Sequence, residues 1–428
     1  MNERIIVVGG GAGGLELAVR LGRKYKRRKN VEVMLIDKNP THIWKPLFHE
    51  VATGSLNSYH DEASYLMLAR KHKFNFTLGR VTTIDSNART VTIDALKDDD
   101  LEIVPEREFH FDTLVVAVGA LSNDFGIPGV REFSRYLDSR EQAERFHKHF
   151  ATQLQRTNLS STSETLTVGI VGGGATGVEL AADMHNVVQR LREYGFEHFG
   201  KERLSVTLVE AAPELLPRLP ERIGVSVREE LGRIGVAVRV DTRVSEVRKH
   251  CVVTSDGEAI PAQISVWAAG VRAPEWLETC GLPVDNLGRI EVNDDLTVKD
   301  CPSVYAIGDC AAARNADGSE IPPRAQAAHQ MATVAAKNIV AQRRGKRTRA
   351  FKYRDFGSLV SLSKYSTVGN LMGNLVRGTI FVEGWIARLV YLSLYRMHQA
   401  TVHGRFSTLL IMLGDRIYKA TRASVKLH

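Results

Sequence analysis

Six short runs of mostly apolar residues predict buried β-strands, and they form two groups in the same order. They are residues 4–10, 31–37 and 111–119, then 165–173, 204–210 and 264–270. Glycines and a helix-forming stretch follow the first run of each group, which predicts parallel sheets built from βαβ crossovers. The pattern therefore predicts an α/β protein with two nucleotide-binding modules, linked by the polar segment 155–165.

Strand signals return after about residue 275 and end in the run 303–312. This late run predicts that the first module resumes after the second has been inserted into it. From about residue 350 the pattern changes, because residues 355–384 are typical of strands or a hairpin and residues 385–428 of two helices broken near Gly404. The pattern as a whole predicts four parts, residues 1–155, 156–275, 276–345 and 346–428.

Both predicted helices of the last part are amphipathic and basic. Apolar residues recur at helical spacing on one face, and basic or polar residues lie on another. The apolar positions are Ile386, Leu389, Val390, Leu394 and Met397, then Phe406, Leu409, Leu410, Leu413 and Ile417. The polar positions are Arg388, Arg396 and Gln399, then Arg405, Arg416 and Lys419. Such faces suit the boundary between lipid headgroups and acyl chains, and equally suit packing on a core or a partner subunit.

A glycine fingerprint, G-x-G-x-x-G, follows the first predicted strand of each module. Its glycines allow a tight turn, close approach of the backbone to a pyrophosphate, and close packing of helix on strand. The following helix presents unpaired N–H groups and a partial positive charge to the phosphates. The fingerprint residues are Gly9, Gly11 and Gly14, with Gly13 among them, and then Gly172, Gly174 and Gly177.

An acidic residue ends the second predicted strand of each module, Asp37 in the first and Glu210 in the second. A carboxylate at this place accepts hydrogen bonds from ribose hydroxyls. Glu210 would also repel a 2′-phosphate, and the residues after it supply no arginine to hold one, so NADH is favoured over NADPH. The distance from Gly177 to Glu210 is long because residues 186–204 are inserted, which makes Glu210 the less secure of the two assignments.

Further turns at strand ends match this plan. "YAIGDCA" (305–311) places Asp309 after a strand, and Gly119 and Gly270 end "VAVGA" (116–120) and "WAAGV" (267–271). The chain resembles the two-dinucleotide flavoproteins, which follow the glutathione-reductase-like plan. The resemblance implies a bound FAD with Asp309 near its ribityl and phosphate part, and an exchangeable NADH that passes a hydride to the flavin. Gly119 would approach FAD and Gly270 would approach NADH.

Thiol chemistry is not expected. Disulfide reductases of this architecture carry a redox cysteine pair soon after the first acidic residue, but residues 38–54 contain no cysteine. The four cysteines, Cys251, Cys280, Cys301 and Cys310, lie elsewhere, form no C-x-x-C pair, and have no histidine at zinc-site spacing. We therefore expect a reduced chain with no metal site and an electron acceptor other than a thiol.

A helix is predicted to begin near Arg324, after two prolines. Gln326 and Gln330 lie four residues apart on one face of it, and a helix starting there would aim its N-terminus at the flavin. Two solvent-facing glutamines would give the same local pattern. The stretch "AQAAHQ" (325–330), however, resembles the quinone motif of the type II NADH:quinone oxidoreductases. Both fingerprints, residues 41–54, the Gly-Asp turn and the last two helices match the same family, so the resemblance covers essentially the whole chain.

This resemblance implies FAD, NADH, a membrane quinone as acceptor, no proton pumping and attachment to one leaflet. Gln326 and Gln330 would line the quinone site, and Glu179 would contact the nicotinamide and relay protons, although a helix-capping glutamate is the plain alternative. Lys364 or Arg377 would supply a basic group near the quinone. The remaining FAD contacts are assigned to Lys38, Lys45, Ala325 and Gln326. Residues 1–155 and 276–345 would hold FAD, 156–275 NADH, and 346–428 would be a membrane-facing α+β unit.

Composition sets outer limits on function. The chain has 428 residues, 43% hydrophobic and 25% charged, with a formal net charge of +8. A mildly basic protein suits an anionic lipid surface, and its scattered charge without interleaved aromatics speaks against nucleic acid. No apolar run approaches the roughly 20 residues needed to span a bilayer. We expect a peripheral homodimer on the cytoplasmic face of the inner membrane; a soluble NADH-dependent reductase of a protein electron carrier is the alternative.

Overall fold

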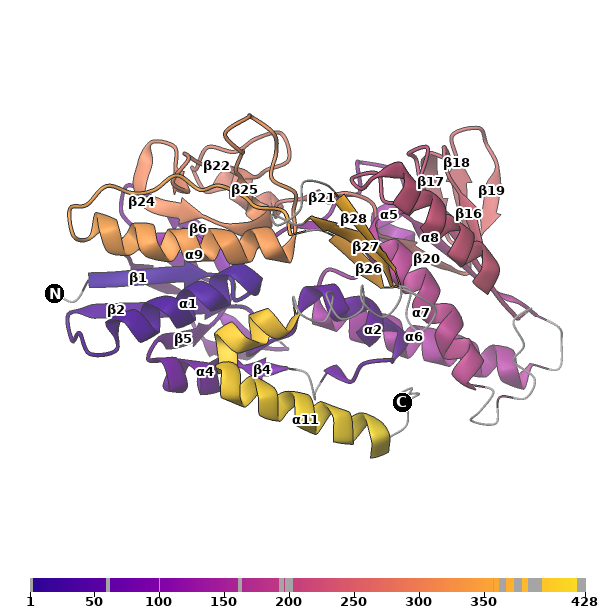
Figure 1. Ribbon diagram of the computed structural model, residues 1–428, viewed down its shortest axis with the longest axis horizontal. Coiled ribbons are helices and arrows are strands. Elements are labelled where there is room, and N and C mark those ends of the chain that lie inside the picture. The colour runs from indigo at the N-terminus through magenta and orange to yellow at the C-terminus, as the bar shows by residue number, and fades with distance from the viewer. Residues whose placement is uncertain are drawn as a thin grey trace.

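The computed structural model describes residues 3–58, 62–99, 101–160, 164–191, 196, 203–356, 358–361, 367–372, 379–383 and 395–421. Two α/β modules lie side by side along the long axis of the molecule (Figure 1). Each is built around a mainly parallel sheet, as the hydrophobic pattern predicts.

The first module has a six-stranded sheet with β1 at its centre. Its strands, in spatial order, are β23 (Thr297–Val298), β24 (Cys301–Ala306), β11 (Thr113–Val116), β1 (Glu3–Val8), β2 (Val31–Asp37) and β5 (Asn75–Leu78). β24 pairs in parallel with β11, so the chain returns to this sheet after the second module. This is the order that insertion of one module into the other produces.

Alternate residues of these strands enter two different cores. Ile5 and Val7 pack under three helices, while Ile6 and Val8 pack under a smaller antiparallel sheet. The helices are α1 (Ala12–Tyr25), α4 (Tyr65–His72) and α9 (Ala325–Gln342). The smaller sheet contains β6 (Val81–Asp85), β7 (Thr90–Ile93) and β10 (Arg107–His110), with the 3-10 helix η4 (Glu275–Thr279) beside it. Both faces of the central sheet are thus covered, as parallel sheets require.

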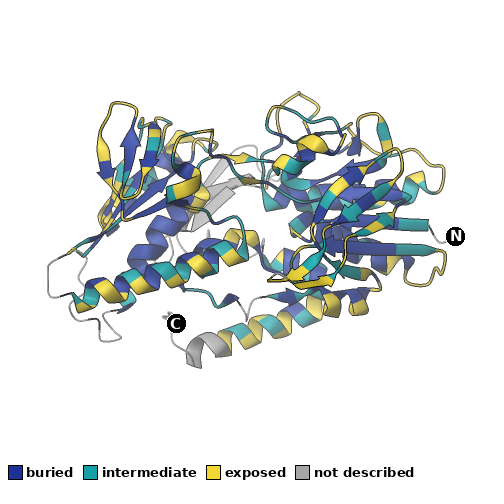
Figure 2. Ribbon diagram, turned by 180° about the vertical axis from the view of Figure 1, so that it is seen from behind, coloured by how far each residue is buried: buried dark blue, intermediate teal, exposed yellow. Residues whose placement is uncertain are grey.

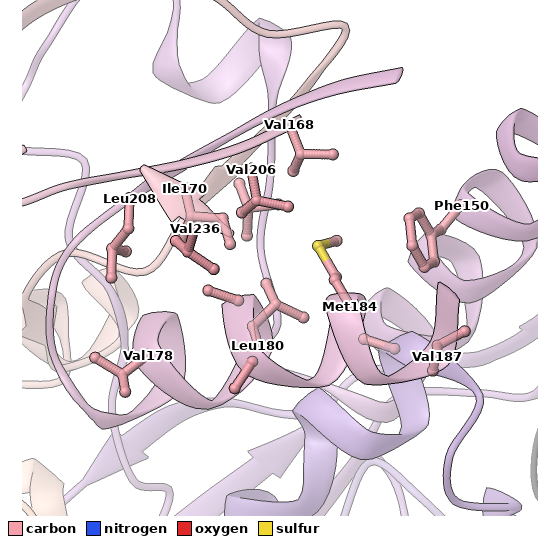
Figure 3. Packing of buried hydrophobic residues seen from close by; sticks show 14 of the residues in the cluster. Phe150, Val168, Ile170, Val178, Leu180, Met184, Val187, Val206, Leu208 and Val236 are labelled. Carbon is pink, nitrogen blue, oxygen red and sulfur yellow. The ribbon is translucent and has the colours of Figure 1, made fainter. Parts of the chain in front are cut away.

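The second module repeats this arrangement. Its five-stranded sheet runs β13 (Ser134–Arg135), β20 (Ile264–Trp267), β14 (Leu166–Val171), β15 (Leu204–Val209) and β16 (Val236–Arg239). One face packs on α2 (Phe48–Thr53), α6 (Arg140–Leu159), α7 (Ala175–Leu191) and α8 (Glu221–Ile234). The other packs on α5 (Val130–Phe133) and on β17 (Val244–Arg248), β18 (Cys251–Thr254) and β19 (Ala259–Pro261). Figure 3 shows Leu180 and Met184 of α7 beneath the strand side chains, with Phe150 of α6 beside Met184.

The predicted boundary between residues 155 and 156 falls inside α6. A capping box of Ser139 and Gln142 starts this helix, and its buried face, including Phe146 and Leu154, belongs to the core of the second module. β13 also pairs with β20 of that module. The polar residues 155–165 are therefore the end of α6 and its connection to β14, and the chain leaves the first module earlier, near β12 (Leu121–Ser122).

Short paired elements make the remaining connections. They are β3 (Thr41–His42) with β4 (Ala63–Ser64), β8 (Leu96–Asp98) with β9 (Leu101–Val104), β12 with β21 (Val271–Arg272), β22 (Ile290–Glu291) with β25 (Ala311–Ala312), and the 3-10 helices η1 (Lys45–Leu47) and η5 (Gly308–Cys310).

The last part of the chain is α+β, as predicted. An antiparallel sheet of β26 (Ser358–Ser361), β27 (Thr367–Met372) and β28 (Thr379–Glu383) contacts α7 and α8. Helical residues 395–403 and α11 (Arg405–Thr421) follow, with the break at Gly404, whose φ is +92°. Figure 1 shows α11 along the edge of the first module, beside α4. There Lys71 Nζ donates to His403 O at 2.7 Å and so ties α4 to the helical break.

Candidate active site

A large cleft, of about 2010 Å³, lies between the two modules. Both glycine turns line it, as do the first turn of α9 and residues 395–398 of the last part. A concave space of this size, rimmed by two nucleotide-binding turns, is the expected place for cofactors and substrates.

The first glycine turn closes β1 onto α1 by direct backbone contact. Gly9 has φ +97°, and a Cβ added at Gly14 would lie 1.8 Å from Gly9 O, so neither position tolerates a side chain. A Cβ at Gly11, in contrast, would meet no atom within 4 Å. The turn is therefore tight underneath and open above, which is the shape that a pyrophosphate requires.

Asp37 holds this turn from the side. One carboxylate oxygen accepts from Gly10 N at 2.6 Å and the other from Asn39 N at 2.8 Å. Burial raises the pKa of Asp37, and the two backbone N–H groups oppose that rise. Each oxygen keeps a further lone pair, so the carboxylate can also accept a ribose hydroxyl.

The second turn repeats this geometry. Gly172 has φ +112°, a Cβ at Gly177 would lie 2.0 Å from Gly172 O, and a Cβ at Gly174 would meet nothing within 4 Å. Glu210 accepts from Gly173 N at 2.6 Å and from Ala212 N at 2.8 Å. Despite the insertion that precedes it, Glu210 thus occupies the same place in its module as Asp37 does in the first.

The other predicted cofactor residues gather around the same cleft. Lys38, Gly13, Ala325 and Asp309 line it, as do Gly119 and Gly270, whose φ values are +72° and +59°. Burial raises the pKa of Asp309, and the nearby charge of Lys45 acts against that rise. Lys45 Nζ donates to Ala120 O at 2.8 Å and so is held beside the Gly119 turn. These residues fit the polar part of a dinucleotide on the first module.

Gln326 and Gln330 both bind the segment that leads into the last part of the chain. Gln326 Nε2 donates to Asp355 Oδ1 at 3.3 Å, and its Oε1 accepts from Phe356 N at 3.2 Å. Gln330 Nε2 donates to Arg354 O at 2.8 Å and Oε1 accepts from Arg354 N at 3.0 Å. Gln326 is buried and lines the cleft, whereas Gln330 is partly exposed. The quinone motif therefore fastens residues 354–356 to α9, a role that the sequence pattern does not reveal.

Glu179 lies on α7 at the wall of the cleft, almost completely buried. His49 of α2 lies between two carboxylates, with Nδ1 3.4 Å from Glu179 Oε2 and Nε2 3.6 Å from Asp183 Oδ2. Burial lowers the pKa of His49, which favours its neutral form beside these groups. The first module thus supplies a titratable partner to the carboxylate of the second.

Known proteins resemble the chain over its full length. The family model for pyridine nucleotide-disulphide oxidoreductases matches residues 3–332. A type II NADH:quinone oxidoreductase of Haemophilus influenzae is 39% identical over 444 aligned residues, covering all of both chains. The enzyme of the same name from Staphylococcus aureus is 31% identical over 88% of this chain and 92% of its own.

The chain belongs to the type II NADH:quinone oxidoreductases. Its fold agrees with that of an NDH2 from Plasmodium falciparum solved in complex with NADH, with a TM-score of 0.82, 19% identity and full coverage of both chains. The predictions of fold class, family, FAD and NADH are confirmed. The roles assigned to single residues stay predictions.

A buried carboxylate of this type II enzyme was missed by the sequence reasoning. Glu16 of α1 is completely buried and contacts His329 of α9 and His398 of the last part. A signal was present, since "GGLELA" (13–18) and "TGVELA" (176–181) place Glu16 and Glu179 at the same position after each fingerprint. Its partners lie more than 300 residues away, where no local pattern could indicate them.

The remaining predicted positions lie either away from the cleft or outside the described residues. The four cysteines are all described, and none lines the cleft. Burial raises the pKa of Cys310 to about 11, which keeps that thiol protonated. Lys364 and Arg377, the two alternatives for a basic residue near the quinone, lie outside the described residues, as do residues 385–394 of the first predicted amphipathic helix.

The two open glycines provide a matched test of the two turns. Gly11→Ala should weaken FAD retention at least about tenfold, and Gly174→Ala should do the same to NADH binding, because each added methyl enters space that a phosphate needs. Both variants should fold, since neither methyl meets a protein atom. Flavin absorbance per protein after desalting and an NADH binding titration measure the two effects. Loss of FAD from the Gly174 variant alone would reverse the assignment.

Proposed function

We propose that this chain is a peripheral membrane flavoenzyme that oxidises NADH through FAD and reduces a membrane quinone without pumping protons. The observation that carries this proposal is the single cleft with two open glycine turns, each held by its own carboxylate. When bound, FAD supplies the hydride acceptance and two-electron transfer that no side chain can perform. The side chains bind, orient and set the charge around it.

We assign the first turn to FAD and the second to NADH. The first turn belongs to the module that also supplies Asp309, Lys45 and α9, so a dinucleotide there has contacts from several elements. The second turn presents Glu210, whose carboxylate faces a ribose and disfavours a 2′-phosphate. This arrangement favours NADH over NADPH.

We place the quinone at the end of the cleft where α9 begins. Apolar and aromatic side chains of different elements meet there: the ring centroids of Trp44 and Tyr395 are 6.0 Å apart, and Met397 also lines the cleft. Gln326 lines the same cleft, and its amide is suited to a quinone carbonyl. Its hydrogen bonds to residues 355–356 would then fix the amide as well as the segment.

The surface that we propose to face the membrane lies on α11. Its apolar residues point away from the protein: Phe406 is 74% exposed, Leu413 54% and Ile417 67% (Figure 2). Arg405 and Arg416 of the same helix are exposed, and Lys71 of α4 lies beside its start. An apolar stripe flanked by basic groups is typical of helices that lie in the surface of an anionic bilayer.

No described helix combines the length and the apolar character that a membrane crossing requires. A soluble reductase of a protein electron carrier would have no use for the exposed stripe, so this alternative is disfavoured. The cytoplasmic leaflet and a homodimer stay predictions.

Glu210 is expected to set the nicotinamide preference. Glu210→Ala should lower kcat/KM for NADH about tenfold or more, because a charged hydrogen bond contributes about 1.5–3 kcal/mol, while kcat/KM for NADPH should fall less or rise. Steady-state kinetics with both nucleotides measure the ratio. Glu229→Gln, a change at an exposed carboxylate of the same module, is the control. An unchanged ratio in the Glu210 variant would assign ribose recognition to another residue.

Gln326 and Glu179 are expected to serve the quinone half of the reaction. Gln326→Ala should slow quinone reduction severalfold to about tenfold, the cost of one neutral hydrogen bond. Glu179→Gln should slow the same step and alter its pH dependence, because a carboxylate that exchanges protons is lost. Stopped-flow absorbance separates the halves, with bleaching by NADH first and recovery of the yellow colour on adding quinone second. Slow bleaching with recovery at the wild-type rate would place both residues on the nicotinamide side.

Charging the apolar stripe should release the enzyme from lipid. Leu410→Glu combined with Leu413→Glu removes two half-exposed leucines, each contributing about 1.5–3 kcal/mol when fully buried in an apolar phase. Binding to anionic vesicles should fall at least about tenfold in a sedimentation assay, while turnover with a water-soluble short-chain quinone persists. Leu159→Glu, at an 82% exposed leucine of α6, is the matched control. Equal vesicle binding by the double variant and the control would refute the assignment of α11.

A further inference from the structure

A buried chain of titratable groups crosses the first module beside the quinone motif. At its centre Glu16, with no exposed surface, has Oε2 2.6 Å from His329 Nδ1 and Oε1 2.9 Å from His398 Nδ1. His398 Nε2 lies 3.0 Å from His42 Nε2, and His42 Nδ1 lies 3.0 Å from Gly10 O. α9 and residues 395–403 thus meet on one carboxylate of α1, and His42 of β3 joins them through His398.

Donor and acceptor rules fix how many protons this chain holds. Gly10 O can only accept, so His42 Nδ1 carries a proton; one more proton lies between the two Nε2 atoms, and another lies between His398 and Glu16. These three protons are one more than two neutral imidazoles carry beside a carboxylate. The set of His42, His398 and Glu16 therefore has no net charge.

The electrostatic directions agree with this count. Burial alone would raise the pKa of Glu16, but the hydrogen bonds and charges of His329 and His398 lower it to about 2. Burial, together with the charge of His398, lowers the pKa of His42 to about 3, which favours a neutral His42 ring. Arg20, at 3.4 Å from Glu16 Oε2, and His403, near His398 and His42, complete the charged surroundings.

All four residues of this buried chain line the cleft, and His329 is the most exposed of them. It lies between Gln326 and Gln330 in the quinone motif, and 19% of its side chain is exposed. Glu16 Oε2 and His329 Nδ1 form a close ion-pair contact, from which we infer that the carboxylate favours a proton on Nδ1 and leaves Nε2 as the nitrogen that exchanges protons. A buried carboxylate fixes the tautomer and orientation of a histidine acid–base group in the same way in hydrolase triads.

The reaction requires a proton donor at this place. NADH delivers two electrons and one proton as a hydride, but conversion of a quinone to a quinol takes two electrons and two protons. One proton per turnover must therefore come from the protein or from water. Glu179 stands at the corresponding position of the other module, so each module brings a buried glutamate from this position to the cleft.

We propose that His329 is the general acid that protonates the quinone and that Glu16 is its positioning residue. His398, from the last part of the chain, binds the other oxygen of the Glu16 carboxylate. In the step, the Nε2–H bond of the His329 imidazolium breaks and an O–H bond forms on the quinone. The neutral ring keeps its Nδ1 proton against Glu16 and regains the Nε2 proton from water in the cleft. This inference rests on the proposed position of the quinone.

The first test follows quinone reduction in the full-length holoenzyme. His329→Ala should slow recovery of the yellow colour on adding quinone about 10²-fold, the lower end of what general acids contribute, with bleaching by NADH close to wild type. Added imidazole should restore part of the rate in this variant. That rescue should follow the imidazolium concentration, so it should fade as pH rises. His250→Ala, at an exposed surface histidine, controls for unspecific effects of imidazole.

The second test separates the charge of Glu16 from a merely structural role. Glu16→Gln keeps a hydrogen-bonding side chain but removes the negative charge that favours the protonated His329 ring. As pH rises, the rate of quinone reduction by this variant should therefore begin to fall at a pH about one unit lower than in the wild type. In a ¹³C-histidine NMR titration of the resting holoenzyme, the signal absent from His329→Gln should move in the same direction. A structural role alone would change neither pH profile. The FAD content of each variant reports whether it has folded.

The outcomes distinguish this inference from the proposed site. If Gln326→Ala slows quinone reduction while His329→Ala and Glu16→Gln keep the wild-type rate and pH profile, the quinone site stands and the general acid is wrong. If none of these variants slows quinone reduction, the position of the quinone itself is wrong. Slowing by His329→Ala without any rescue by imidazolium, or without a shifted profile in Glu16→Gln, would also overturn the proposal.

Discussion

The contact between strand and helix at each glycine turn is the constraint on which the rest of this structure depends. Gly14 and Gly177 approach the carbonyl oxygens of Gly9 and Gly172 so closely that no Cβ could be accommodated. The close approach places the helix N-terminus over the end of the sheet and leaves the space above the turn open. A carboxylate at the end of the next strand then accepts from the residue after the first fingerprint glycine: Asp37 binds Gly10 N, and Glu210 binds Gly173 N.

Features encoded within some forty residues could be predicted from the sequence. The strand–glycine–helix units, both fingerprints and both acidic residues follow from local spacing. Glu210 is found despite the insertion before it because its backbone contacts depend on the strand end alone. Contacts between distant segments could not be predicted in this way. α6 joins the second module through Phe146 and Leu154, whose apolar spacing is equally compatible with either core. The glutamines of the quinone motif hold residues 354–356, which a pattern of spacing on one helix cannot reveal.

The two modules also share a buried glutamate, in addition to their glycine turns. Each first helix carries a buried glutamate two residues beyond the fingerprint, and each glutamate meets histidines from other parts of the chain. Burying a carboxylate is costly unless partners compensate it, so its presence in both helices ties each module to its neighbours. On the first module these partners come from the quinone motif and from the segment that precedes α11. The proposed acceptor site and the proposed membrane-facing helix are therefore connected through one buried carboxylate.

The position of Glu16 has a further consequence for how the chain is made. The carboxylate leaves the ribosome early, whereas His398, its partner, follows 382 residues later. At about 5–20 residues per second, that interval is roughly 20–75 s. Throughout this interval Glu16 lacks one of its two histidine partners. A polypeptide cut short before residue 398 never gains that partner, so its first module keeps a buried carboxylate that is less fully compensated than in the finished chain.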